Sequence, residues 1–213
     1  MSRRKASGAG TSGANATEGP PATWRDGWVD GIRHVPSPNA DARPPGGDVT
    51  LAIIHSISLP PGQYGGDAIE RLFTNRLDFD AHPYYQGIRG LRVSAHFLVR
   101  RDGEPVQFVS CDARAWHAGR SVWRGRETCN DYSIGIELEG LEGETFEAAQ
   151  YATLASLLAA CAQRYPLDAV AGHEHVAPGR KGDPGAGFDW RRCAAELRGA
   201  ATRLRPSMEA LAR

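Results

Sequence analysis

The stretch from Ser133 to Glu139 alternates strictly between apolar residues and residues that are small or polar. One side of the extended chain carries Ile134, Ile136 and Leu138, and the other carries Ser133, Gly135, Glu137 and Glu139. A period of two residues is typical of a β-strand and does not suit an α-helix. The chain must therefore build a sheet whose apolar face is covered by other elements.

Other segments predict what surrounds this strand. Further strands are expected at Leu51–His55, at the two arms of a hairpin turning at Asp102-Gly103 (95–101 and 105–109), and at Val170–His173. Helices are expected at 67–74, 146–165 and 189–197, the last with Asp189 as N-cap. The helix at 146–165 has the clearest pattern, because Tyr151, Leu154, Leu158 and Cys161 recur at spacings of three and four. The expected fold is mixed α/β, with one mainly mixed sheet flanked by helices.

The length of 213 residues suits one domain with a full core. Residues 1–23 are rich in Gly, Ala, Ser, Thr and Pro and show no periodicity, so we expect a disordered N-terminal tail. The folded domain is expected at residues 24–205, followed by a C-terminal tail at 206–213.

Charge and composition exclude several classes of partner. Lys and Arg equal Asp and Glu at 25 each, so no net field favours nucleic acid or an anionic membrane. No apolar run approaches the roughly 20 residues of a membrane span, and no apolar stretch follows the basic residues 3–5 as in an export signal. The four cysteines form no CxxC pair. We therefore expect a cytoplasmic protein with reduced thiols.

The candidate chemistry lies in residues 171–185, a loop rich in Gly and Pro that carries His173, Lys181 and Asp183. His55 stands at the end of the apolar run that begins at Leu51. Two histidines and one carboxylate are the protein share of a catalytic zinc site, which leaves a position open for water. Spacing alone does not choose between His173 and its neighbour His175 as a ligand.

Glu137 is the candidate general base, because it lies on the polar side of its strand beside Gly135, where a substrate could approach. Glu139 shares that side and competes with it on pattern alone. Trp116 is a candidate platform for a sugar or peptide, although isolated tryptophans more often belong to a core.

Taken together in chain order, these motifs resemble the AmpD-type 1,6-anhydro-N-acetylmuramyl-L-alanine amidases, within the N-acetylmuramoyl-L-alanine amidase and peptidoglycan-recognition superfamily. The resemblance covers about Trp24 to Leu197. The matching stretches are Gly27-Trp28, Val35 to Asn39, Ile54 to Gly62, Leu91 to His96, Arg100 to Gly103, Arg114 to Gly119, Cys129 to Asp131, Ser133 to Gly140, and Gly172 to Gly185. Any one of them is weak, but the ordered set is specific.

The resemblance implies a role for each candidate. It makes His55, His173 and Asp183 the ligands of Zn²⁺, Glu137 the catalytic glutamate, and Lys181 the residue that stabilises the tetrahedral intermediate. His175 and Glu139 then have other roles.

It also places Arg92 and Trp116 near the bound substrate. Two positions depart from the pattern of the family. Ser56 stands where asparagine is frequent after the first ligand, and Thr128 stands where an arginine is frequent, with Arg126 two residues earlier. We therefore take Ser56 and Arg126 as further candidates for substrate binding.

The activity implied is zinc-dependent hydrolysis of the amide between the lactyl group of 1,6-anhydro-N-acetylmuramic acid and L-alanine. The expected partner is a small muropeptide, with no nucleic acid and no membrane, and the expected state is a monomer. Alternatives are an amidase that acts on intact peptidoglycan and a non-catalytic peptidoglycan-recognition module.

Overall fold

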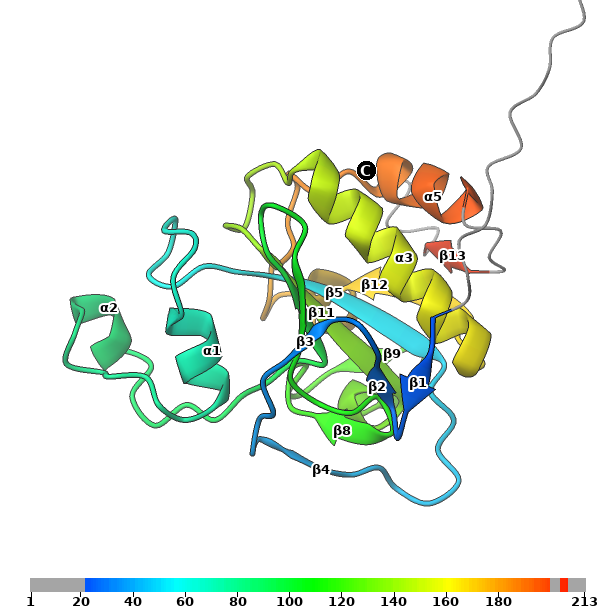
Figure 1. The fold of residues 1–213 in the computed structure, drawn as a ribbon, viewed down its shortest axis with the longest axis horizontal. Helices are drawn as coiled ribbons and strands as arrows, with labels where there is room; N and C mark the ends of the chain where they lie inside the picture. The colour runs from blue at the N-terminus through cyan, green and yellow to red at the C-terminus, as the bar shows by residue number, and fades with distance from the viewer. Residues whose placement is uncertain (1–21, 200–203, 207–213) are drawn as a thin grey trace, which may run out of the picture.

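The computed structural model describes residues 22–199 and 204–206, and a seven-stranded sheet lies at its centre (Figure 1). In spatial order its strands are β13 (Arg205–Pro206), β12 (Ala169–Gly172), β5 (Leu51–Ile57), β11 (Ser133–Glu139), β6 (Phe97–Val99), β7 (Pro105–Gln107) and β3 (Arg33–His34). Neighbouring strands are parallel except at the β6–β7 hairpin, which is antiparallel. The predicted mixed α/β fold with a mixed central sheet is confirmed.

Short elements surround the sheet. Three antiparallel ladders pair β1 (Trp24–Arg25) with β2 (Trp28–Val29), β4 (Ala40–Ala42) with β8 (Ala113–Ala115), and β9 (Val122–Trp123) with β10 (Arg126–Glu127). The helices are α1 (Ala68–Phe73), α2 (Pro83–Gln86), the 3-10 helix η1 (Cys129–Tyr132), α3 (Ala148–Arg164), α4 (His173–Val176) and α5 (Trp190–Gly199). None of the helices in the described part of the chain is long and apolar enough to cross a membrane.

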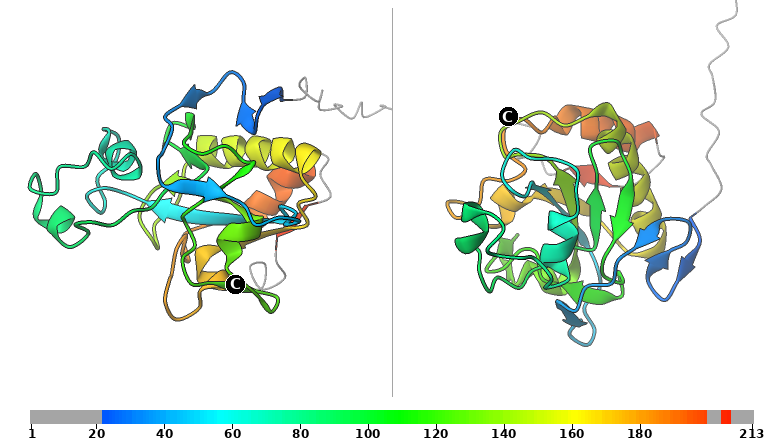
Figure 2. Two further views of the ribbon diagram at one scale, coloured as in Figure 1. Left: turned by 90° about the horizontal axis from the view of Figure 1, so that it is seen from below. Right: turned by 60° about the vertical axis from the view of Figure 1, so that its left-hand side comes forward.

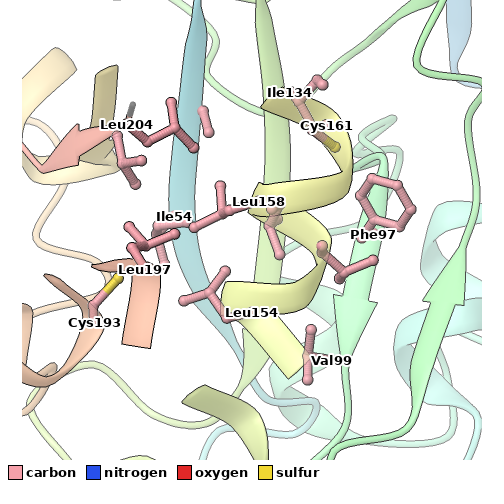
Figure 3. Packing of buried hydrophobic residues seen from close by; sticks show 14 of the residues in the cluster. Ile54, Phe97, Val99, Ile134, Leu154, Leu158, Cys161, Cys193, Leu197 and Leu204 are labelled. Atoms are coloured by element: carbon pink, nitrogen blue, oxygen red, sulfur yellow. The ribbon is translucent and has the colours of Figure 1, made fainter. Parts of the chain in front are cut away.

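Helices α3 and α5 cover one face of the sheet and enclose the larger core with it (Figure 3). Leu154 and Leu158 of α3 are fully buried over Ile54 of β5, and Leu197 of α5 packs beside them. Burying a side chain of this size contributes roughly 1.5–3 kcal/mol, so this layer supplies much of the folding free energy.

The opposite face is covered in part by α4, η1 and the loop around residue 118, which enclose a smaller apolar cluster with it (Figure 2). Its core contains Leu51 and Ile53 of β5, which alternate with the residues that face α3. Because the side-chain period of a strand is two, His55 also faces this side. Helices α1 and α2 form a separate lobe beside the carboxyl end of β5, at the left of Figure 1.

Local patterns predicted α1, α3, α5 and the strands β5, β6, β7, β11 and β12 within a few residues, but they did not predict the three short ladders, β3, β13 or the four-residue helices α2, η1 and α4. The strand at 133–139 has the predicted bounds, and the hairpin turns at Asp102-Gly103, where Asp102 Oδ1 accepts a hydrogen bond from the amide of Glu104. Helix α3 begins after Glu147, whose side chain forms a capping box with Gln150.

All seven residues of β11 are buried, so the side that carries Glu137 is an interior surface. One expectation was wrong in detail. Strand β12 ends at Gly172, because His173 already begins α4.

The predicted tails fall largely outside the described residues. Residues 1–21 of the predicted N-terminal tail and residues 207–213 of the predicted C-terminal tail are not described. Ala22 packs against the larger core, and β13 pairs with β12 at the edge of the sheet.

Candidate active site

The carboxyl ends of three adjacent parallel strands bring the candidate residues together. His55 in β5 lies directly beside Glu137 in β11, and Gly172 at the end of β12 is in register with Ile54, so that His173 follows beside His55. Ligands of open α/β sheets bind outside the carboxyl ends of strands, where loops diverge. The sheet register therefore fixes the position of three candidate side chains before any loop contributes.

The side chains of His55, His173 and Asp183 form a compact triangle of ligand atoms. The Nδ1 atoms of the two histidines are 3.0 Å apart, and each lies 3.1 Å from Oδ2 of Asp183. There is a point about 2 Å from each of these three atoms, and about 2 Å is the length of the bonds that zinc makes to imidazole and carboxylate. The donor set and its spacing thus fit a zinc ion with an open position.

The loop after α4 carries Asp183 to the histidines because the backbone at Gly172 leaves room for it. A Cβ atom at Gly172 would lie 2.9 Å from Cδ of Pro184. The amide of Glu174 donates to the carbonyl of Asp183 at 2.9 Å, which holds the loop against the start of α4. His175 turns away from the triangle, and its Nδ1 accepts a hydrogen bond from the amide of Gly172 at 2.8 Å.

In each histidine of the triangle, the ring nitrogen that points away from the triangle, Nε2, also has a partner. His173 Nε2 lies 3.1 Å from the carbonyl of Ala118, and His55 Nε2 lies 2.9 Å from Nδ1 of His117. Such outer partners fix the tautomer and the ring orientation of metal-binding histidines. Both partners belong to the loop at residues 117–118, so one loop orients both rings.

Burial and mutual proximity control protonation in the triangle. Burial, together with the neighbouring His173, lowers the pKa of His55 to about 4. Burial alone would raise the pKa of Asp183, but hydrogen bonds from His173 and His55 hold it below its usual value. Neutral imidazoles and an ionised carboxylate are the forms that bind a metal cation.

Glu137 has the environment of a general base beside the triangle. It is 8% exposed, and its Oε2 atom has no hydrogen-bond partner among the described residues. Burial raises the pKa of this carboxyl well above its usual value, and the charge of Asp183 adds to the effect while Lys181 opposes it. A buried carboxylate oxygen without a partner is costly and points to a group that arrives with the reaction.

Glu139 is used differently, although it lies on the same side of β11. Its Oε1 accepts hydrogen bonds from the amide of Gly65 at 2.7 Å and from Arg100 Nη1 at 3.1 Å. Arg100 also pairs with Glu70 at the start of α1. Glu139 therefore fastens the loop before α1 to the sheet.

A cleft of about 330 Å³ opens over the triangle. Its polar end contains Glu137, Lys181 and Ser56, whose buried Oγ atom has no hydrogen-bond partner among the described residues. Its other end is apolar and comes from the α1–α2 lobe, with Leu72, Phe73, Tyr84, Ile88, Leu91 and Val93. The cleft thus joins polar groups at the reacting end to an apolar wall.

Three predicted substrate residues are not among the side chains that line this cleft. Arg92 is exposed next to the lining residues Leu91 and Val93. Trp116 is half-buried, and its amide donates to Ser94 Oγ at 3.0 Å. Arg126 is exposed on β10, with its guanidinium 3.8 Å from the ring centre of Tyr132.

Comparison with known proteins agrees with this geometry. Residues 45–186 match the family model described as N-acetylmuramoyl-L-alanine amidase. This chain belongs to that amidase family. Among its relatives, the 1,6-anhydro-N-acetylmuramyl-L-alanine amidase AmpD of Citrobacter freundii is 54% identical over 78% of this chain and 90% of its own length. The enzyme of the same name from Escherichia coli K12 is 54% identical over 78% of this chain and 92% of its own. The AmpD-type resemblance seen in the sequence is thereby confirmed.

Solved structures of amidases show the same fold. The crystal structure of a selenomethionine derivative of AmpD matches with a TM-score of 0.79 and 51% identity, covering 82% of this chain and 99% of its own. The amidase AmiD of E. coli, in complex with anhydro-N-acetylmuramic acid-L-Ala-D-γ-Glu-L-Lys, matches with a TM-score of 0.52 and 30% identity over 70% of this chain and 57% of its own.

Sequence reasoning missed the groups that support the amidase site from behind. In the sequence, His117 stood out only as part of the matching stretch from Arg114 to Gly119, and the carbonyl of Ala118 carries no pattern at all. Gly135 was interpreted as an opening for substrate, but a Cβ atom there would lie 2.4 Å from Cγ of His117. The space beside Gly135 is therefore filled by an imidazole of the protein itself.

Proposed function

We propose that this amidase is zinc-dependent and cleaves the amide between the lactyl group of 1,6-anhydro-N-acetylmuramic acid and L-alanine in free muropeptides. The observation that carries the proposal is the triangle of His55, His173 and Asp183 beside the unpartnered carboxylate oxygen of Glu137 in one cleft. The AmpD relatives, which bear this substrate in their names and match most of the chain, support the choice of amide.

His55, His173 and Asp183 would hold the zinc, and their geometry leaves the side toward the cleft open. Zinc bound there supplies Lewis acidity toward water and toward the scissile carbonyl. Glu137 accepts the proton of the attacking water on Oε2, because that atom is buried and bonded to nothing else described.

The remaining steps also belong to side chains of this chain. Lys181 lines the cleft, and its ammonium group stabilises the negative charge that develops on the carbonyl oxygen. Glu137 then returns its proton to the departing amine of L-alanine, and burial, which raises the pKa of this carboxyl, favours holding the proton until the amine departs. Ser56, which also lines the cleft, is our proposed further contact for the substrate.

We place the enzyme in the cytoplasm, where it recycles imported wall fragments as a monomer. The four buried free thiols are compatible with a reducing compartment. A compact cleft walled by the α1–α2 lobe suits a small bicyclic sugar with its peptide better than a long glycan strand. Arg92, Trp116 and Arg126 remain our proposed contacts for parts of the peptide that extend beyond the cleft.

The test measures kcat/KM for anhydro-muramyl tripeptide and for the same muropeptide with a reducing sugar, with metal analysis of the same preparation. We expect about one zinc per chain and a clear preference for the anhydro form. Equal values, or faster release of peptide from insoluble sacculi, would refute the recycling role. Full activity in metal-free protein would refute the zinc assignment.

A further inference from the structure

A second imidazole lies directly behind the first ligand of the proposed metal site. His117 is buried, and its Nδ1 is 2.9 Å from His55 Nε2, on the side of His55 that faces away from the triangle. The other nitrogen of His117, Nε2, lies 3.3 Å from Oγ of the fully buried Ser133. The contacts among these three side chains lead from the triangle along β11, past Gly135, to Ser133 at the start of that strand.

The line of hydrogen bonds fixes where each proton sits. If Nδ1 of His55 gives its lone pair to a cation, the proton of this neutral ring must be on Nε2, which then donates to His117. His117 must accept on Nδ1 and therefore carries its own proton on Nε2, where Ser133 Oγ accepts it. The reverse tautomer of His117 would set two N–H groups against each other at 2.9 Å.

The surrounding backbone is shaped to hold the His117 ring in this place. Gly135 of β11 presents no side chain to it, and an added Cβ would approach the ring to 2.4–2.7 Å. The backbone of the loop is held as well, because Oδ1 of Asn130 in η1 accepts hydrogen bonds from the amides of His117 and Ala118 at 3.3 and 2.8 Å. The ring is thus confined from the strand side and from its own backbone.

We propose that His117 is a positioning residue of the metal site: it accepts the Nε2 proton of His55, and thereby holds the ring and the tautomer that bind zinc. The inference rests on the zinc site proposed above. Ser133 Oγ accepts the Nε2 proton of His117 and so supports that tautomer, and Gly135 makes room for the ring. His173 has a simpler arrangement, because a backbone carbonyl, that of Ala118, serves as its acceptor.

The test compares two substitutions of similar bulk, His117→Gln and His117→Leu. The amide oxygen of glutamine accepts a hydrogen bond, whereas leucine accepts none. Zinc affinity is measured by competition with a chromophoric chelator, and the melting temperature of the metal-free protein is measured alongside. We expect His117→Leu to weaken zinc binding by about 10- to 100-fold, which is the usual effect of losing such a partner. His117→Gln should recover most of that loss.

A packing role would give another result. It would lower the melting temperature of the metal-free protein and leave the zinc affinity of the folded fraction unchanged, which would overturn the proposal. Equal weakening of zinc binding by the glutamine and leucine variants would also overturn it, since the acceptor would then not matter.

Ser133→Ala removes a single oxygen and is expected to fold, so it keeps the proposal testable if both His117 variants are insoluble. It should weaken zinc binding to a smaller degree than His117→Leu, and unchanged affinity would contradict the tautomer argument. Zinc binding by the wild-type protein separates this inference from the proposed function. If the wild-type protein binds no zinc, the proposed function is refuted. If it binds zinc tightly and substitution of His117 does not change the affinity, only the inference is refuted.

Discussion

Two glutamates on the same side of one strand should respond in opposite ways to the same substitution. Glu137→Gln removes the proposed base, and Glu139→Gln removes the anchor of the loop before α1. Loss of a general base costs about 10²- to 10⁴-fold in rate, or about 3–5 kcal/mol of transition-state stabilisation. We expect Glu137→Gln to lose activity within that range and to retain its zinc.

The stability of the metal-free Glu137→Gln variant should rise at neutral pH. Burial raises the pKa of Glu137 in the folded state above its unfolded value of 4.5. Below that value both states are protonated and the carboxyl gives no pH dependence. As the pH rises, the unfolded chain releases its proton while the folded chain retains it, so stability falls until the pH passes the folded pKa. The amide of the variant's glutamine does not ionise. The stability advantage of Glu137→Gln over wild type should therefore grow as the pH rises from 4.5 toward the folded-state pKa of Glu137.

Glu139→Gln should show the reverse pattern. Glu139 is 2% exposed, and its carboxylate accepts hydrogen bonds from the amides of Gly65 and Arg101 and from the guanidinium of Arg100. Hydrogen bonds to a buried charge contribute roughly 1.5–3 kcal/mol each, but Arg100 keeps its partner Glu70, so a net loss of about 2–3 kcal/mol is expected. Activity per folded, zinc-loaded molecule should change little.

The assay measures kcat/KM, zinc content and the free energy of unfolding without metal for both variants. A stable, inactive Glu139→Gln beside an active Glu137→Gln would refute our assignment of the base. Loss of zinc from Glu137→Gln would refute the separation between base and ligands.

Three further expectations follow from the contacts above. Asp183→Asn should bind zinc much more weakly. Zinc at a thousand times the wild-type Kd stabilises the wild-type protein by about 4 kcal/mol, and the same concentration should no longer raise the melting temperature of the variant. Lys181→Met should lower kcat by about 10²- to 10³-fold, as for loss of a group that stabilises an oxyanion, while zinc content measured by metal analysis stays unchanged. Leu154→Ala, at a fully buried position of α3, should destabilise the protein by about 2–5 kcal/mol in denaturant titration without changing kcat of the folded enzyme.

The sequence predicted those features that depend on neighbours along the chain. The alternation in 133–139 and the three- and four-residue spacing from Tyr151 to Cys161 are local consequences of backbone geometry, and the structure has both elements. Pattern could not separate Glu137 from Glu139, because the difference lies in contacts with Gly65 and Arg100, which are distant in sequence.

The same limit applies to the histidines. His173 and His175 are two residues apart on a very short helix, and spacing does not separate them. In the structure His173 Nδ1 lies 3.1 Å from Asp183 Oδ2, whereas His175 Nδ1 accepts a hydrogen bond from the amide of Gly172. His117 lies 62 residues from His55 along the chain. The sequence signal that could have found it was Gly135, a glycine inside an otherwise regular strand, which marks a place where something bulky approaches closely.

The period of two that identified the central strands also divides their roles. Along β5 and β11, residues such as Ile54 and Ile136 face α3 and contribute burial, whereas His55 and Glu137 on the opposite side carry the proposed chemistry. Apolar packing on the first side can hold the sheet rigid while the second side keeps buried polar groups that cost stability until metal and substrate arrive. Because the two sides share the same backbone, the register between β5 and β11 sets the separation of His55 and Glu137 directly. A one-residue slip of β5 or β11 would turn His55 or Glu137, respectively, toward the apolar core, so the packing that stabilises the fold also specifies the geometry of the site.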